Sequence, residues 1–260
     1  MQIGIIGLGL VGGAIRHGFA KIGHMVRGYD IKYPETRFAD ILETELCFIC
    51  VPTPNTPEGF CDTTIVRKVI QEFSLAGYRG LVVIKSTVTP GTTDQLARTY
   101  PTMKFAYCPE FLREKATYTD FVENHDLCAI GAYDDASFEL VKQAHGELPE
   151  HFAKMTPTEA ELTKYFVNVY NAYRIIFANE FFEVCKTLGA DYMHIKNAMV
   201  RRRNVGNAYL DCNDNFRGYG GSCLPKDTEA FAMFVKQLGL NIKMFEAIVE
   251  ENKKFKTTVL

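Results

Sequence analysis

The first half of the chain alternates short apolar runs with stretches whose apolar residues recur at helical spacing. Two such stretches, residues 11–23 and 135–146, have the pattern of amphipathic helices, and the first ends at Gly23. Six apolar runs have the length of buried strands: residues 2–9, 24–30, 45–52, 79–87, 104–110 and 127–132. Strands that alternate with helices in this way predict a doubly wound parallel sheet.

The pattern changes near residue 150, after which helical periodicity dominates. A long helix is predicted to begin with Thr156 as N-cap, Pro157 in the first position and Glu159 completing a capping box. It would end at Leu188, because Gly189 stands where a C-terminal glycine cap belongs. Such a helix would be about 45 Å long at 1.5 Å per residue.

Three more helical stretches follow the long one, at residues 192–202, 227–239 and 244–258. We therefore expect two domains: an α/β domain over residues 1–150, and an all-α domain with a long central helix over residues 151–260. No internal repeat or low-complexity tract interrupts either part.

Composition fits an ordinary globular protein. Of the 260 residues, 47% are hydrophobic and 23% charged, and the formal net charge is −2. This balance gives no reason to expect nucleic acid or an anionic membrane as a partner. The apolar start of the chain lacks a basic segment and is rich in glycine, so we do not interpret it as a signal peptide. Eight cysteines in a chain of this size predict reduced thiols and a cytoplasmic location.

Cys47 and Cys50 form a C-x-x-C pair, which can mark a redox or zinc site. The pair lies in a predicted strand, where residues three apart point to opposite faces roughly 10 Å apart along the chain. That separation is too long for a disulfide. We predict two buried core thiols and no metal site.

The segment "GLGLVG" follows the first predicted strand and opens a helix, as in Rossmann-like dinucleotide-binding domains. Gly7 permits a tight turn, Gly9 lets a pyrophosphate approach the backbone, and Gly12 lets helix and strand pack closely. Leu10 and Val11 complete the turn, where the helix N-terminus meets the phosphate charge.

Asp30 ends the next predicted strand, about 20 residues further on, where a carboxylate accepts the ribose hydroxyls of a bound dinucleotide. The same carboxylate would repel a 2′-phosphate, so the expected cofactor is NAD rather than NADP. Thr53 and Thr87 follow the third and fourth predicted strands, where ligands bind in such sheets. Their hydroxyls are expected beside the nicotinamide half of the bound NAD. The alternative is that they are turn residues without a binding role.

Two further segments carry groups suited to chemistry on a carbonyl. Lys164 and Asn168 lie four residues apart in the long helix, so both can donate to one developing oxyanion. In "GYGGSCLPKD", glycines give Cys223 backbone freedom, and Lys226 provides the positive surroundings that favour a nucleophilic thiolate. The alternatives are a solvated helix charge for Lys164 and a packing cysteine for Cys223.

Six segments in this order resemble the UDP-glucose/GDP-mannose dehydrogenase family, over nearly the whole chain. They are "GLGLVG", "VPTPN", "KSTVTPGTT", "PEFLRE", "AELTKYFVN" and "GYGGSCLPKD". The resemblance implies a four-electron oxidation of a sugar C6 alcohol to a carboxylate with two NAD in succession, UDP-glucose to UDP-glucuronate being the expected conversion. It also implies a homodimer formed through the helical domain.

The resemblance also assigns roles to residues. Cys223 would capture the intermediate aldehyde as a thiohemiacetal that becomes a thioester, while Lys164 and Asn168 hold the C6 oxygen. Asp227 would activate water, and Thr87, Glu110 and Glu114 would complete the catalytic group. The cofactor would also contact Thr87, Glu114 and Lys226. The expected substrate contacts, beyond Lys164 and Asn168, are Phe111, Leu112, Arg113, Tyr219 and Gly220.

Three features of the sequence modify this picture. Glu110 and Glu114 are expected to share a helix face, or to form a salt-bridged surface turn. Arg201–Arg203 form a basic cluster, expected to be solvated or to contact a substrate phosphate. The chain departs from the family in ending at Leu260, so we expect a short form that lacks the third, UDP-binding domain. The segment from Asp30 to "VPTPN" is also shorter than in the family, which trims the adenine side of the cofactor site.

Two alternatives remain open from the sequence. A two-electron β-hydroxyacid dehydrogenase would share the domain plan and the helix lysine with asparagine four residues later, but does not need Cys223. A catalytically inactive NAD-binding subunit is the other alternative, although Thr87, Lys164 and Asp227 all match the family pattern.

Overall fold

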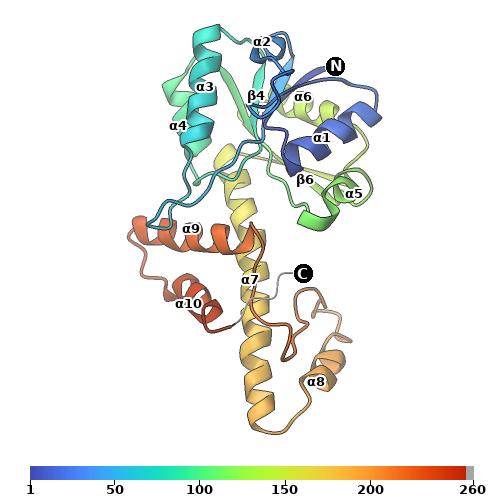
Figure 1. The fold of residues 1–260 in the computed structure, drawn as a ribbon, viewed down its shortest axis with the longest axis vertical. Helices are drawn as coiled ribbons and strands as arrows, with labels where there is room; N and C mark the ends of the chain where they lie inside the picture. Colours follow the sequence, from blue (N-terminus) through green and yellow to red (C-terminus); the bar gives the residue numbers. More distant parts are fainter. Residues whose placement is uncertain (256–260) are drawn as a thin grey trace. The chain divides into compact units, whose positions relative to one another are not determined.

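The computed structural model describes residues 1–255 and divides into two compact units. The first unit comprises residues 1–54 and 61–164, and the second comprises residues 55–60 and the chain from residue 165 onward. Figure 1 shows the sheet and its flanking helices in the first unit and a helical second unit, which confirms the predicted fold class.

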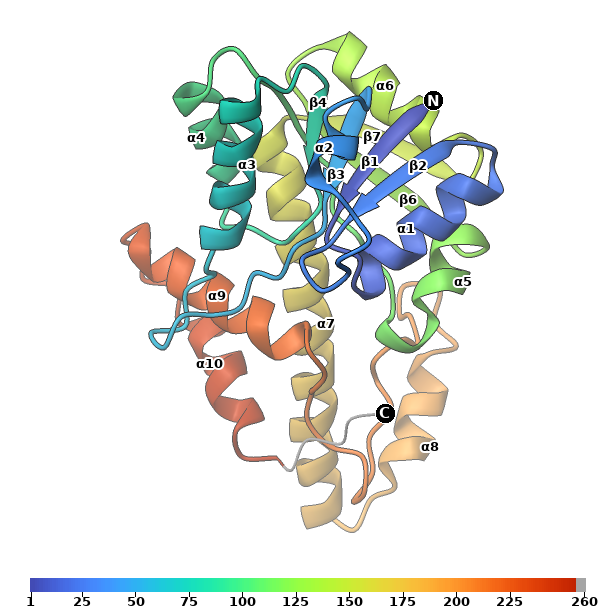
Figure 2. The same ribbon diagram turned by 45° about the horizontal axis from the view of Figure 1, so that its top comes forward.

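The first unit contains a seven-stranded sheet with the order β2-β1-β3-β4-β5-β6-β7. Its strands are β1 (Gln2–Ile6), β2 (Met25–Tyr29), β3 (Leu46–Ile49), β4 (Leu81–Ile84), β5 (Lys104–Tyr107), β6 (Leu127–Ala132) and β7 (His151–Met155). The neighbours pair in parallel from β2 through β5, so β1, β3, β4 and β5 end at one edge of the sheet. Figure 2 shows β1, β2 and β3 side by side.

One strand pair departs from the expected parallel arrangement, because β6 runs antiparallel to β5. The connection between them contains only a short 3-10 turn, η1 (Glu114–Ala116), and α5 (Thr117–Val122). The helix α5 packs on α1 (Leu10–Lys21), where a Cβ at Gly18 would lie 2.5 Å from the ring of Phe121. The chain therefore turns back into the sheet instead of crossing it with a full-length helix.

Helices cover both faces of the sheet, and an apolar cluster lies beneath each layer. On one face α1, α5 and α6 (Asp135–His145) contribute buried residues, including Ile15, Phe121 and Val141. On the other face the buried residues come from α2 (Phe38–Ile41), α3 (Thr64–Ala76) and α4 (Thr92–Thr99). Cys47 packs in the second cluster and Cys50 against the first, which confirms that this pair faces opposite sides of the strand.

The long helix α7 (Pro157–Thr187) forms as predicted. Thr156 accepts a hydrogen bond from the backbone of Glu159, and the Glu159 carboxylate accepts one from the backbone of Thr156, which is a capping box. Gly189 adopts a left-handed φ of 68° just after the helix ends. The first eight residues of α7 belong to the first unit, and the remainder to the second.

The second unit contains the rest of α7 with α8 (Tyr192–Met199), α9 (Leu224–Gln237) and α10 (Lys243–Asn252). Buried residues of α7, including Val169 and Ile176, pack with Tyr219 and Ile248 in its main core. The predicted helix over residues 244–258 is present to Asn252, and its last three positions lie outside the described residues.

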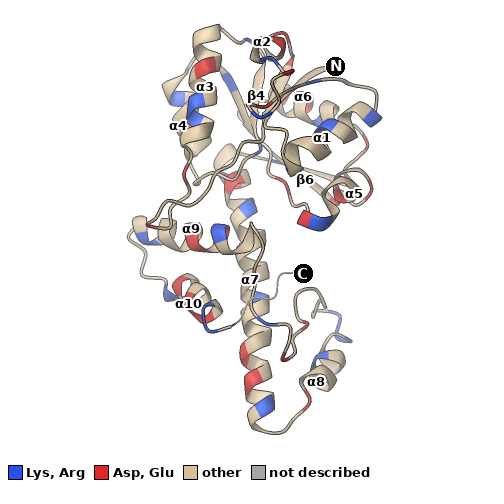
Figure 3. Ribbon diagram, in the orientation of Figure 1, with Lys and Arg blue, Asp and Glu red and all other residues tan. Residues whose placement is uncertain are grey.

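The first unit extends further along the chain than the expected boundary at residue 150. The strand β7 begins at His151 and pairs with β6, so the sheet is complete only after this boundary. The sequence analysis missed β7 because "HFAKM" is short and only partly apolar. Acidic and basic residues are interspersed along the helices of both units (Figure 3). No described helix is long and apolar enough to cross a bilayer.

Candidate active site

The glycine-rich turn connects β1 to α1 with the geometry that its glycines require. Gly7 has a φ of +89°, and a Cβ there would lie 2.6 Å from the carbonyl oxygen of Cys50. A Cβ at Gly12 would lie 1.9 Å from the carbonyl oxygen of Gly7, so helix and strand pack too closely for a side chain. Nothing lies within 4 Å of the Cβ position at Gly9, which leaves the backbone open to an approaching ligand. The turn therefore fits a dinucleotide pyrophosphate.

The carboxylate of Asp30 lies at the same turn. Its Oδ2 accepts a 2.7 Å hydrogen bond from the backbone N–H of Leu8, and its Oδ1 accepts one of 2.9 Å from the backbone N–H of Lys32. The carboxylate is thus held between β2 and the glycine turn, where a ribose would follow the pyrophosphate.

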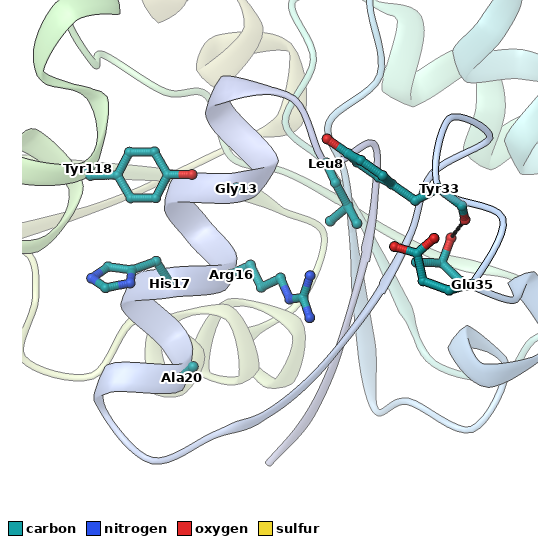
Figure 4. Close-up of a pocket in the computed structure, with 9 residues that line it drawn as sticks. Leu8, Gly13, Arg16, His17, Ala20, Tyr33, Glu35 and Tyr118 are labelled. Atoms are coloured by element: carbon teal, nitrogen blue, oxygen red, sulfur yellow. Dashed lines mark hydrogen bonds between the residues drawn. The ribbon is translucent and has the colours of Figure 1, made fainter.

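A pocket of about 460 Å³ adjoins the glycine turn in the first unit. Figure 4 shows Arg16 and His17 on α1 at one side, and Tyr33 and Glu35 from the loop after β2 at the other. Leu8, Gly13, Ala20, Thr36 and Tyr118 complete the lining. The pocket has the size of a small-molecule site and lies beside the loop that Asp30 begins, so it suits the adenosine side of a dinucleotide.

Thr53 and Thr87 lie beyond the ends of β3 and β4, at the edge of the sheet where the glycine turn also lies. Thr53 is buried and Thr87 half-buried. Ser86 joins the two strand ends, because its Oγ donates a 2.7 Å hydrogen bond to the carbonyl oxygen of Val51. Cys61 donates to the carbonyl oxygen of Thr87 at 3.4 Å.

Lys164 and Glu110 form a buried ion pair in the first unit. The Nζ of Lys164 lies 2.9 Å from Oε1 of Glu110 and donates a 2.7 Å hydrogen bond to the Glu110 carbonyl oxygen. Burial alone would raise the pKa of Glu110, but the Lys164 ammonium and the backbone N–H of Leu112 hold this pKa below its usual value. Glu110 therefore fixes the position of the ammonium.

The segment "PEFLRE" does not form the expected helix face. Residues 109–113 have no regular secondary structure, and Glu114 begins η1, so Glu110 and Glu114 do not share a helix face. The reason is local: the Glu110 carboxylate accepts the backbone N–H of Leu112, and the Arg113 backbone donates to Asp120.

The other expected ligand-binding residues of this segment have different surroundings. Phe111 lies under the ammonium of Lys164, 5.9 Å from Nζ to the ring centroid. The guanidinium of Arg113 makes a bidentate pair with Asp120, whose pKa this hydrogen bonding lowers to about 2. Leu112 is partly buried, and Glu114 is exposed.

Cys223 occupies the N-cap position of α9 and is exposed. The helix begins at Leu224, three residues earlier than predicted, because Pro225 suits its first turn. Gly218 and Gly221 adopt positive φ values of 63° and 78° before it, which a residue with a Cβ rarely adopts. The thiol is therefore presented at the positive end of a helix, which favours negative charge.

The early start of α9 changes the surroundings of Lys226 and Asp227. The Nζ of Lys226 lies 2.5 Å from Oδ1 of Asp227, so its ammonium pairs with this carboxylate, whereas its nearest expected partner was Cys223. Asn168 donates a 2.6 Å hydrogen bond to the other oxygen of Asp227. Asp227 is 1% exposed, and its carboxylate accepts from both neighbours.

Tyr219 and Gly220 precede the cysteine. Tyr219 is buried, its hydroxyl donates to the carbonyl oxygen of Ile248, and its backbone is held by Asn252. These contacts give Tyr219 a packing role in the second unit. Arg201–Arg203 are exposed in turns after α8, as a solvated basic cluster would be.

Two residues near the expected site were missed from the sequence. Asn55, in the second unit, donates to the carbonyl oxygen of Lys226 at 3.0 Å and to the Glu229 carboxylate at 2.9 Å. Glu161 is fully buried and accepts hydrogen bonds from the backbone of Gly91 and from Thr93. The signal for Asn55 was its place in "VPTPN", and for Glu161 an acid on the apolar side of a helix.

The candidate residues thus form two groups, one in each unit. The first contains the glycine turn with Asp30, Thr53, Thr87 and the Lys164–Glu110 pair. The second contains Asn168, Cys223, Lys226 and Asp227. Lys164 and Asn168 are one helical turn apart on α7, which supplies both groups.

A doubly wound sheet with this glycine turn, followed by a helical region, defines a dinucleotide-binding protein of the dehydrogenase type. The UDP-glucose/GDP-mannose dehydrogenase family matches in two parts, its NAD binding domain over residues 32–148 and its central domain over residues 158–254. The chain belongs to this family. The family consists of NAD-dependent nucleotide-sugar dehydrogenases, which confirms the predicted enzyme class and cofactor at the level of the family.

Individual relatives agree with this assignment. The chain is 29% identical to UDP-glucose 6-dehydrogenase AglM of Haloferax volcanii, over 97% of this chain and 69% of that protein. It is 31% identical to the UDP-glucose 6-dehydrogenase of Rickettsia bellii, over 86% of this chain and 52% of that one. The solved UDP-glucose dehydrogenase of Pyrobaculum islandicum is 32% identical with a TM-score of 0.88, over 97% of this chain and 68% of that structure. The chain thus spans about half to two thirds of the length of these relatives.

Proposed function

We propose that this chain oxidises the C6 alcohol of a nucleotide sugar to a carboxylate, with UDP-glucose as substrate and UDP-glucuronate as product. One observation carries the proposal: an exposed thiol, Cys223, caps the helix whose first turn holds the buried carboxylate of Asp227. The backbone N–H of Asp227 donates to the carbonyl oxygen of Cys223 at 2.9 Å, so the two residues occupy one turn. A nucleophile and a base held together suit acyl chemistry on sulfur.

The proposed reaction has three stages. The C6 alcohol first loses a proton and a hydride, which gives an aldehyde. The Cys223 thiolate adds to the aldehyde carbon and forms a thiohemiacetal oxyanion. This oxyanion loses a second hydride and becomes a thioester. Water then displaces the thiol and leaves the carboxylate, with Asp227 accepting the proton of the attacking water. NAD, when bound, accepts one hydride at each oxidation, so two are consumed for each sugar.

The other residues stabilise charge or hold groups in place. Lys164 and Asn168 donate to the C6 oxygen, where negative charge develops, and one such donor typically contributes ~10²–10³ in rate. Thr87, Glu110 and Glu114 complete the catalytic group. Gly7, Gly9 and Gly12 would hold the pyrophosphate, Asp30 the adenosine ribose, and the pocket beside Arg16 the adenine side.

We also propose that two copies of the chain associate through α7. Six exposed apolar residues recur on the second unit's part of this helix at intervals of four, three, four, four and three: Phe166, Tyr170, Tyr173, Phe177, Phe181 and Val184, here called the α7 stripe. They are 40–71% exposed among the described residues, while the opposite face of α7 packs in the second unit's core. Such spacing suits a helix pair, and a two-fold axis lets one stripe cover its own copy. The eight free cysteines fit a reducing compartment such as the cytoplasm.

Counting NADH tests the reaction directly. Purified chain with NAD and limiting UDP-glucose is expected to form two NADH per sugar, with UDP-glucuronate identified by mass spectrometry. Cys223→Ser should form no net acid, whereas Cys212→Ser, a buried cysteine of the same unit, should retain the wild-type ratio. One NADH per substrate without dependence on Cys223 would instead favour a β-hydroxyacid dehydrogenase. NAD binding without turnover on UDP- or GDP-hexoses would favour the inactive subunit.

A further inference from the structure

Three metal-ligating side chains to which the proposed reaction gives no role converge inside the first unit. Cys108 follows β5, Cys128 lies in β6 and His145 ends α6. Their sulfur and nitrogen atoms all lie within 4.8 Å of one another, and the two sulfurs are 3.7 Å apart. All three residues are at most 1% exposed. Cys108 and Cys128 are 20 residues apart in the chain, and Cys128 and His145 are 17 apart, so no short sequence motif indicates the cluster.

The imidazole of His145 is oriented as a ligand. Its Nδ1 lies 2.8 Å from the carbonyl oxygen of Val141, which can only accept, so Nδ1 carries the proton. The lone pair is then on Nε2, which is buried and has no hydrogen-bond partner among residues 1–255. Buried polar atoms without a partner are uncommon and call for an explanation. A ring whose other nitrogen donates to a backbone carbonyl is the usual arrangement of a metal-bound histidine.

The charged and titratable neighbours of the cluster are Lys85, His125 and Cys50. The Nζ of Lys85 lies 3.3 Å from the sulfur of Cys108 and also donates to the carbonyl oxygens of Cys108 and Pro109. Burial lowers the pKa of His125 to about 4, and its ring, 5.8 Å from that of His145, stays neutral. Burial raises the pKa of Cys50 to about 12, so this neighbour of Lys85 stays a thiol.

We propose that Cys108, Cys128 and His145 bind a soft, thiophilic cation, Cu(I) or Zn²⁺. With metal–sulfur bonds of about 2.3 Å, two thiolates on one tetrahedral ion are about 3.8 Å apart, close to the separation in this structure. Thiolates select Cu(I) and Zn²⁺ among common metals.

A disulfide fits the two cysteines less well. Tyr107 pairs with Gly131 as the last residue of β5, so a continued register would place Cys108 diagonal to Cys128. Diagonal neighbours have Cα atoms about 7–8 Å apart. This separation exceeds the usual span of a disulfide, which would require the backbone to move.

A bound ion would fix the end of β5. Cys108 is followed directly by Pro109 and Glu110, and Glu110 holds Lys164. The ion would therefore stabilise the first unit and steady the segment that carries Glu110, while taking no part in hydride transfer.

Metal content measures the proposal without any activity assay. All variants carry Cys223→Ser, which removes the exposed cysteine of the described chain. The reduced full-length protein is titrated anaerobically with Cu(I) in competition with bathocuproine disulfonate, and separately with Zn²⁺, then desalted for elemental analysis. One equivalent of Cu(I) or of Zn²⁺ is expected, with a raised melting temperature and, for Cu(I), thiolate-to-metal charge-transfer absorption in the ultraviolet.

Matched variants locate the ion. Cys108→Ser and Cys128→Ser should each lower the affinity by about 100-fold or more, and His145→Gln should lower it less. Cys47→Ser, a buried cysteine on the other face of the sheet, should bind as the parent does. Circular dichroism verifies that each variant is folded. If Cys108→Ser does not fold, His145→Gln and Cys128→Ser test the site separately. Retention of one equivalent of either ion that is lost in Cys108→Ser would support the site and identify the metal. Binding of neither ion above the level of Cys108→Ser would overturn the site itself.

Discussion

Asn168 of α7 donates a 2.6 Å hydrogen bond to Asp227 of α9, whose carboxylate is almost completely buried. Lys226 approaches the other oxygen of the same carboxylate at 2.5 Å. An ionised carboxylate is costly to bury unless such donors compensate it. The contact therefore joins the proposed oxyanion donor to the proposed base, and one substitution should affect both the fold and the chemistry.

Replacing Asn168 tests this link. Asn168→Ala removes one donor from a buried carboxylate, which should lower the free energy of unfolding by about 1–3 kcal/mol. The same change should lower kcat by ~10²–10³, because a donor to the C6 oxygen is lost. Urea unfolding and steady-state kinetics measure the two effects. Asn171→Ala, a buried asparagine on the same helix, should lower stability without a comparable loss of kcat. Wild-type kcat in Asn168→Ala would remove this residue from the mechanism.

The Lys164–Glu110 pair predicts a stability that depends on pH. Glu110 has a pKa below its usual value, so it stabilises the fold above about pH 4.3, and this contribution is lost as the pH falls through its folded pKa. Lys164→Met leaves the buried carboxylate without its ammonium, which should lower the free energy of unfolding by about 3–5 kcal/mol at pH 7. The stability lost in Lys164→Met should become smaller towards pH 5. Without the ammonium, burial raises the pKa of Glu110, so its carboxylate takes up a proton.

A double-mutant cycle isolates the pair. Lys164→Met/Glu110→Gln removes both charges and should recover part of the stability that Lys164→Met loses. Urea unfolding at pH 5 and pH 7.5 measures each corner of the cycle. Equal stability of wild type and Lys164→Met at pH 7.5 would show that the pair contributes nothing to the fold.

Glu161 predicts a pH dependence of the opposite sign. Burial raises its pKa to about 7, although Thr93 and the Gly91 backbone donate to it. A carboxyl with a raised pKa in the folded state adds stability that is fully present below about pH 4.5 and lost as the pH rises through 7. The loss is about 3 kcal/mol for a shift of this size.

Comparing the free energy of unfolding of wild type with that of a variant separates the effect of Glu161 from the titration of other groups. Glu161→Gln keeps the side-chain shape and cannot ionise. The stability of wild type relative to Glu161→Gln should therefore fall between pH 5 and pH 8, as measured by urea unfolding. A difference that stays constant over this range would contradict the raised pKa.

The sequence predicted elements whose signals are local. Six strands, the capping box of Thr156 and Glu159, and the glycine turn from Gly7 to Gly12 are each specified within a few residues, and the structure has them. The antiparallel direction of β6 was missed, because it depends on how α5 packs against α1. The strand β7 was missed because an edge strand that is half exposed need not be strongly apolar.

The sequence identified the residues of the candidate site better than it identified the partners that these residues contact. The motifs named Lys164 and Asp227, but the partners of these charges come from distant parts of the chain. Glu110 is 54 residues from Lys164, and Asn168 is 59 residues from Asp227. Spacing within a motif suggested that Lys226 serves Cys223, whereas the helix that begins at Leu224 pairs Lys226 with Asp227. Pairing across such separations follows from packing, which no local pattern encodes.

The α7 stripe predicts the assembly. Phe177 lies at its centre, is 49% exposed and contacts the ring of Phe181 at a centroid distance of 5.8 Å. If two copies pair through the stripe, Phe177→Glu places a carboxylate on each side of the two-fold axis in an apolar interface. The dissociation constant should then rise by ~100-fold or more, because about 3 kcal/mol corresponds to two decades.

Light scattering coupled to size-exclusion chromatography, over a range of protein concentrations, measures this shift. The matched control is Leu75→Glu, which adds the same charge at a residue of α3 that is 81% exposed and lies outside the stripe. It should remain a dimer at concentrations where Phe177→Glu is a monomer. The stripe has no role in association if wild type and Phe177→Glu elute with the same mass at every concentration. Its exposed aromatic residues would then need another partner, because apolar side chains in an unbroken row are costly to leave in water.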